Sequence, residues 1–130
     1  MIALDTNLLA RLLLRDDAAQ HARVKALLRS DRVFTAPITV MLELVWVLEA
    51  NDCTPAEIEH GLNLLLGLAN FQPKQADALR AALRGYAQGL DFADALHLAL
   101  SAGDEAFASF DKALVRKATR LGLAPRVASA

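Results

Sequence analysis

Short apolar runs alternate with longer segments of helical periodicity along nearly the whole chain, and this alternation constrains the fold more than any other feature. Residues 1–4 form the first apolar run, and leucines then recur at the spacing of one helix face, at Leu8, Leu9, Leu12 and Leu13. Strands separated by helices pair in parallel, because the connecting helix returns the chain to the same end of the sheet. The sequence therefore predicts a layered α/β fold with parallel strands.

The same periodicity and the capping residues assign the remaining elements. Thr54, Pro55 and Glu57 form a capping box with proline at the first helical position. Gly103 and Gly122 are expected to end the last two helices. Strands are predicted at residues 1–4, 32–36, 71–72, 106–110 and 126–127, and helices at 8–13, 18–28, from Pro37 onward, 54–69, 74–88, 91–102 and 112–121.

Length and composition predict a single domain over residues 1–130. The chain has 130 residues, is 55% hydrophobic and has a mean hydropathy of +0.28, which is too apolar for a disordered chain. The first apolar run is broken by Asp5 and Arg11, so it makes a poor signal peptide. The single cysteine, Cys53, excludes an intramolecular disulfide and fits a reducing cytoplasm.

The net charge of −1 is unlike that of a typical nucleic-acid binder, which is more often basic. The charge is unevenly distributed, however, because the chain from Lys112 onward contains cations and no acid. The acidic excess therefore lies upstream, partly in side chains that are candidate metal ligands. A bound divalent ion would make that region more positive.

Glu43 is the only polar residue in the apolar segment 40–48, and Thr39 lies one helical turn before it. We expect a helix this apolar to be covered nearly all round, and a buried carboxylate is costly unless it is paired or bound to a metal. Glu43 is therefore a candidate metal ligand. The alternative is a glutamate that reaches solvent at a helix edge or pairs with an arginine.

A polar stripe runs along the otherwise apolar helix at 91–102, formed by Asp91, Asp94, His97 and Ser101. Asp94 is the first candidate ligand in this stripe. Asp91 ranks after it, because a helix N-cap already explains an aspartate at that position. The alternative for the stripe is an ordinary exposed helix face, and for His97 a hydrogen-bonded packing residue.

Asp5 and Asp111 each follow a predicted strand directly and precede a helix. Ligands of α/β proteins bind beyond the carboxyl ends of the strands, where such residues gather. The alternative for each aspartate is N-capping of the next helix. Asn7 could orient a carboxylate or a water beside Asp5.

These residues resemble the PIN-domain family, and in particular the VapC ribonuclease toxins of type II toxin–antitoxin systems. The family has an aspartate after a first apolar strand, here MIALDTN with Asp5, and a glutamate within an apolar helix, here Glu43. Asp94 in DFADALHLA and Asp111 in ASFDKAL match its later aspartates, so the resemblance covers essentially the whole chain. The chain departs from the family in the last strand, where Phe110 intervenes between Ser109 and the aspartate.

The resemblance implies a three-layer α/β/α PIN-like fold with a central parallel sheet and an acidic pocket that binds metal. Oxygen ligands suit Mg2+ or Mn2+ and argue against zinc. Such an ion would orient and partly deprotonate a water that attacks an RNA phosphodiester, leaving 5′-phosphate and 3′-hydroxyl ends. The resemblance also implies a homodimer and inhibition by a cognate VapB-like antitoxin. The expected ligands are Asp5, Glu43, Asp94 and Asp111, with Asp91 as an additional one.

Other side chains have supporting roles in this hypothesis. Asn7, Thr39 and Ser109 are candidate residues around the metal ligands. The cations that follow Asp111 could hold the RNA backbone, although an ordinary solvated helix face is the better explanation for at least some of them; they are Arg116, Lys117 and Arg120.

Three other functions fit parts of the same pattern. A phosphatase with Asp5 as nucleophile needs a second aspartate two residues later, where this chain has Asn7. A nucleotide-binding Rossmann domain needs a glycine-rich loop after the first strand, and none is present. A catalytically silent PIN-like binding module has no reason to retain all four acids, because their charges repel one another.

Overall fold

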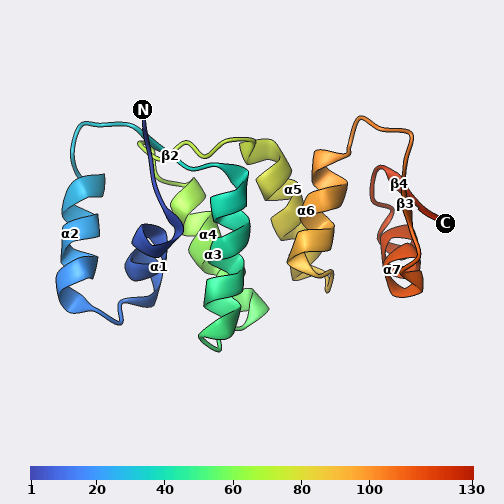
Figure 1. The fold of residues 1–130 in the computed structure, drawn as a ribbon, viewed down its shortest axis with the longest axis horizontal. Helices are drawn as coiled ribbons and strands as arrows, with labels where there is room; N and C mark the ends of the chain where they lie inside the picture. Colours follow the sequence, from blue (N-terminus) through green and yellow to red (C-terminus); the bar gives the residue numbers. More distant parts are fainter. The chain divides into compact units, whose positions relative to one another are not determined.

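A computed structural model describes all residues, Met1–Ala130, and divides them into two compact units. Unit 1 comprises Met1–Ala76 and unit 2 comprises Asp77–Ala130 (Figure 1). The chain forms seven helices and four strands, and each unit holds one two-stranded parallel sheet. The predicted α/β class and the parallel pairing are confirmed. That residues 1–130 act as a single domain stays a prediction.

Unit 1 contains the first two strands and the first four helices. They are β1 (Ile2–Ala3), α1 (Thr6–Leu14), α2 (Ala18–Leu28), β2 (Phe34–Thr35), α3 (Ile38–Ala50) and α4 (Pro55–Leu66). β1 pairs with β2, with Ile2 opposite Phe34, and Phe71 forms a further parallel bridge to Phe34. α1 packs against both α2 and α3, and α3 packs against α4 (Figure 1).

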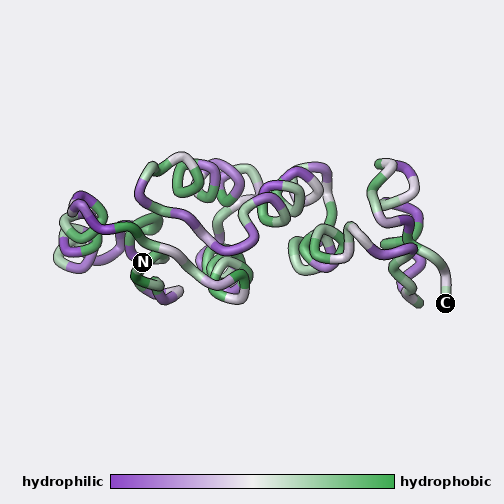
Figure 2. The backbone as a smooth tube through the Cα atoms, turned by 90° about the horizontal axis from the view of Figure 1, so that it is seen from above, coloured by the Kyte–Doolittle hydropathy of each residue, from purple (hydrophilic) through white to green (hydrophobic).

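The core of unit 1 forms because its helices bury apolar residues at helical spacing. Figure 2 shows hydrophobic and hydrophilic residues mixed within the helices, as expected for helices with one buried face. The largest fully buried side chains of this unit are Leu9, Phe34, Met41, Leu44, Val45, Ile58, Leu62 and Leu65. Thr54 starts α4 with the predicted capping box, since its hydroxyl accepts the Glu57 N–H at 3.2 Å and its own N–H donates to Glu57 Oε1 at 2.9 Å.

Unit 2 contains the other three helices and two strands. They are α5 (Ala76–Ala87), α6 (Phe92–Leu100), β3 (Ala106–Ser109), α7 (Lys112–Leu121) and β4 (Arg126–Ser129). β3 pairs in parallel with β4 over its full length, and the connecting helix α7 packs on both strands. The Tyr86 ring of α5 meets the Phe92 ring of α6 edge to face, with centroids 5.6 Å apart. This contact lies directly beside Asp91, where α6 begins.

Most predicted elements are confirmed, and the bounds of α2 and α7 are as predicted. Pro37 is the residue before α3 and not its first helical residue, because its ψ of 154° is extended. Gly103 does not cap α6; the helix ends at Leu100, and the Ser101 N–H closes its last turn on the carbonyl of His97. The structure has no helix with the length and apolar character needed to span a membrane.

Candidate metal centre

Asp5 lies at the N-terminus of α1, directly after the short strand β1. Its backbone is extended, and its Oδ1 accepts the Asn7 N–H at 2.8 Å. The capping role considered for Asp5 is therefore present in the structure. The cap uses only one carboxylate oxygen and the side chain is exposed, so the second oxygen is accessible to a ligand.

Glu43 is exposed, so the expectation that it is buried in an apolar helix is wrong. α3 buries a single face made of Met41, Leu44, Val45 and Leu48, which recur at helical spacing. The opposite side of α3 is open to solvent even where its residues are apolar, since Trp46 is 51% exposed. The Glu43 side chain therefore faces solvent.

Thr39 lies on the same exposed side of α3 as Glu43, one helical turn earlier. Asp5, Glu43, Asn7 and Thr39 all belong to unit 1 and are all exposed. These four residues are the predicted site residues that belong to unit 1.

Unit 2 contains the other three predicted carboxylates, Asp91, Asp94 and Asp111, at the starts of α6 and α7. Asp91 caps α6, and its Oδ2 accepts the Asp94 N–H at 3.1 Å. Asp111 caps α7, and its Oδ1 accepts the N–H groups of Ala113 and Leu114 at 3.0 and 3.1 Å. Two helix N-termini thus present carboxylates in the same unit, and each cap engages one oxygen.

Asp94 is half-buried, and its surroundings disfavour its charge. Burial raises the pKa of Asp94, and the negative charges of Asp91 and Asp111 raise it further, against the opposing effects of His97 and Lys117. Asp91 and Asp111 therefore each oppose the charge of Asp94. His97 and Lys117 offset only part of this effect, since the pKa of Asp94 stays raised, and a bound cation would oppose it further.

Ser109 supports Asp111 even though Phe110 intervenes between them. The Ser109 hydroxyl accepts the Asp111 N–H at 3.0 Å, which holds the turn from β3 into α7. Phe110 is 86% exposed and leaves this contact undisturbed. The departure from the family pattern therefore does not displace Ser109 from the site.

The cations and the histidine near this group have different surroundings. Arg116, Lys117 and Arg120 are all exposed, and the Lys117 ammonium donates to the Gly89 carbonyl at 3.3 Å. The His97 ring stacks on Phe107, with centroids 6.3 Å apart and planes 10° apart. The interpretation of His97 as a packing residue is favoured by this contact.

The structure contains no ready-made cage in which three or more His, Cys, Asp or Glu side chains are arranged to hold a metal ion. The aspartates of unit 2 affect one another through charge, which acts over longer distances than metal–oxygen bonds do. All five candidate ligands are carboxylates, and none of them takes part in the ion pair between Arg11 and Asp16. This donor set fits a hard divalent cation.

The PIN domain family profile matches residues 2–120. The chain belongs to the PIN-domain family. The match runs through both units and includes every candidate ligand. PIN domains are generally nucleases and typically use divalent metals, so membership supports a nuclease role for this chain. No curated protein matches the chain.

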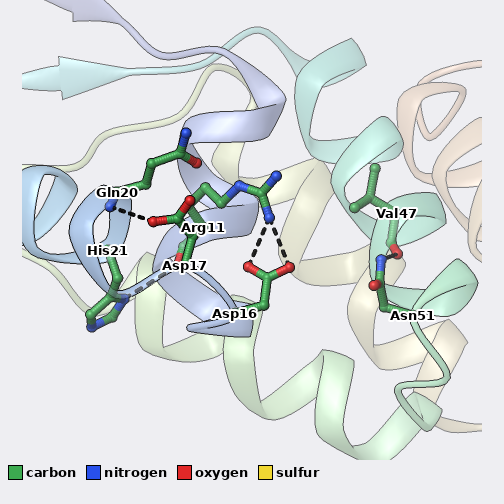
Figure 3. A network of polar contacts seen from close by, with 7 residues as sticks. All are labelled: Arg11, Asp16, Asp17, Gln20, His21, Val47 and Asn51. Atoms are coloured by element: carbon green, nitrogen blue, oxygen red, sulfur yellow. Dashed lines mark hydrogen bonds and ion pairs between the residues drawn. The ribbon is translucent and has the colours of Figure 1, made fainter.

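The sequence did not predict the ion pair between Arg11 and Asp16 in unit 1 of this PIN domain. Arg11 on α1 donates through Nη1 to both carboxylate oxygens of Asp16, at 2.8 and 2.7 Å (Figure 3). The two residues lie five positions apart across the end of α1, a spacing that no helical pattern marks. The turn after Leu14, where Arg15 adopts a left-handed conformation with φ 56°, brings them together.

Proposed function

We propose that this PIN domain is a metal-dependent endoribonuclease that hydrolyses RNA phosphodiesters and acts as the toxin of a toxin–antitoxin pair. The observation that carries the proposal is the group of Asp91, Asp94 and Asp111, whose charges oppose one another in a chain that matches a nuclease family. Carboxylates that repel one another are costly for a fold, and a bound metal ion gives a reason to keep them.

The proposed ligands are the carboxylates predicted from the sequence. Asp5, Glu43, Asp94 and Asp111 bind Mg2+ or Mn2+, with Asp91 as an additional ligand. The bound ion supplies an activated water and neutralises charge on the phosphate. Ser109 positions Asp111 through the N–H contact described above. Thr39 and Asn7 lie beside Glu43 and Asp5 and orient the water or the carboxylates.

Exposed cations on α7 are suited to hold the RNA substrate. Arg116 and Arg120 are exposed and bind the phosphate backbone by charge. Lys117 lies near Asp94 and lowers its pKa, so its role is to stabilise the carboxylate in its charged form. The products have 5′-phosphate and 3′-hydroxyl ends.

The biological setting is part of the same proposal. The protein acts in the reducing cytoplasm as a homodimer, and a cognate VapB-like antitoxin inhibits it by inserting a segment into the active site. Co-expression with the product of a neighbouring gene, followed by a toxicity assay, tests this part separately from the chemistry.

Cleavage of a loop-containing RNA in Mg2+ or Mn2+ tests the proposed activity. Asp5→Asn and Asp94→Asn should each abolish cleavage while the circular dichroism spectrum stays unchanged. Asp31→Asn and Asp104→Asn are matched controls, because both remove one exposed acid outside the candidate site. Full activity in Asp5→Asn or Asp94→Asn would refute the role of that residue, and metal-dependent RNA binding without cleavage would indicate the binding module instead.

A further inference from the structure

α1 and α2 enclose a pocket of about 280 Å³ in unit 1. Its apolar wall consists of Leu8, Val24 and Leu27, and its polar side chains are those of Asn7, Arg11, Gln20 and Arg23. An apolar wall with a few convergent polar groups is typical of small-molecule sites. The chemistry of the lining therefore identifies the kind of ligand that fits.

The polar groups of the pocket favour an anion. Asp16 holds Arg11 through Nη1 alone, so Nε and Nη2 of the guanidinium are left for a ligand (Figure 3). Asp16 offsets the charge of Arg11, so Arg11 offers mainly its remaining N–H donors to an anion. The nearby Asp17 caps α2, where it accepts the Gln20 N–H at 3.0 Å. Arg23 is exposed and adds a second guanidinium to the lining. Guanidinium groups of this kind bind phosphate well.

The pocket begins beside the candidate metal ligand of unit 1. Asn7 lines the pocket, and its N–H donates to Asp5 Oδ1 at 2.8 Å. Arg11 lies one turn further along α1, or about 6 Å along the helix axis at about 1.5 Å per residue. A ligand in this pocket is therefore next to Asp5 and extends away from it along α1.

We propose that the α1–α2 pocket binds one nucleotide of the RNA strand next to the phosphodiester that is cleaved. The base lies against Leu8, Val24 and Leu27, and the phosphate is held by Arg23 and Arg11. This inference rests on the proposed ribonuclease function. It adds a substrate-binding site that belongs to unit 1 alone and that contains no metal ligand.

Amide NMR of the full chain with uridine 5′-monophosphate in EDTA tests the site without metal or cleavage. The nucleotide should shift the amide signals of residues 7–11 and 20–27 and bind more tightly than inorganic phosphate, because only the nucleotide covers the apolar wall. Arg23→Gln should weaken nucleotide binding about tenfold, the loss expected for one charge-assisted contact. Arg32→Gln removes the same charge from an exposed residue outside the pocket and should leave binding unchanged.

Steady-state cleavage kinetics in Mg2+ provide the second measurement. Arg23→Gln should raise KM with little change in kcat, and should reduce the slope of log affinity against log salt by about 0.7. The proposed nucleotide site is wrong if Arg23→Gln and Arg32→Gln weaken nucleotide binding equally. It is also wrong if the nucleotide shifts only amide signals of residues outside the pocket. If the wild-type protein binds the nucleotide here but cleaves no RNA with metal, the pocket stands and the proposed function fails.

Discussion

At Gly85, α5 lies so close to α6 that there is little room for a side chain. Gly85→Ala should therefore destabilise unit 2. A Cβ added at Gly85 would lie 3.1 Å from Leu90 Cδ1 and 3.3 Å from the Ala95 Cβ. Leu90 can turn aside, but the Ala95 Cβ is fixed to the backbone of α6. Ala95 directly follows Asp94, so the displacement should reach the candidate site.

The expected magnitude follows from two opposing effects. Alanine is better than glycine inside a helix by about 1 kcal/mol. Carbon atoms prefer separations of about 3.5–4.0 Å, so the new methyl group overpacks the helix contact, at a cost of about 1–3 kcal/mol. The net expectation for Gly85→Ala is a loss of about 1 kcal/mol.

Gly61→Ala is the matched control. Its Cβ would meet the methyl groups of Leu13 at 3.5 and 3.6 Å, which is ordinary contact. This variant should gain about 1 kcal/mol from helix propensity alone. At about 4 °C per kcal/mol, the Tm values of the two variants should differ by about 8 °C.

Thermal unfolding of both variants, with RNA cleavage measured alongside, provides the test. Gly85→Ala should lose both stability and activity, whereas Gly61→Ala should keep its activity. Ala95→Gly should be less harmful in the Gly85→Ala background than in the wild type, because it removes the clashing methyl group. If Gly85→Ala proved as stable as Gly61→Ala, α5 and α6 would accommodate the added methyl group without strain, and the reasoning would be wrong.

The remaining predictions concern the aspartate group and the α4 cap. Saturating Mg2+ or Mn2+ should raise Tm, with about 2.7 kcal/mol of stabilisation at one hundred times Kd, and Asp94→Asn should remove this rise. Because the pKa of Asp94 is raised, its ionisation destabilises the metal-free fold as pH rises past the ordinary aspartate range. Asp94→Asn should therefore increase the Tm of the metal-free protein at neutral pH. A decrease in that Tm would contradict the charge repulsion. Thr54→Ala should cost about 1 kcal/mol in a urea titration. The pKa of Glu57 is lowered chiefly by the backbone N–H of Thr54, so the contribution of Glu57 is present above its ordinary pKa and lost as pH falls through the lowered value. The cost of Glu57→Gln should therefore shrink at low pH, and a cost that does not change with pH would argue against this contribution.

Local sequence rules predicted those parts of the fold that depend on neighbouring residues. The bounds of α2 follow from periodicity, and those of α7 from periodicity, Asp111 as a cap and Gly122 with a φ of 65° at its end. The placement of Asp5 after a strand followed in the same way. Capping and periodicity act within a few residues, so a single sequence contains the information they need.

The surroundings of the candidate residues were decided by tertiary structure. Apolar composition alone does not show how many faces of a helix have neighbours, so the exposure of Glu43 and Trp46 was not predicted. The charges that act on Asp94 come from the start of α7 as well as from its own helix.

The sequence by itself determined which residue types precede each helix and therefore which carboxylates are available for chemistry. Only the tertiary structure decided which of them repel one another, and that Arg11 and Asp16 meet beside a pocket between α1 and α2. The physical reason is that burial and charge interactions depend on distances through space, which the spacing along the chain does not specify.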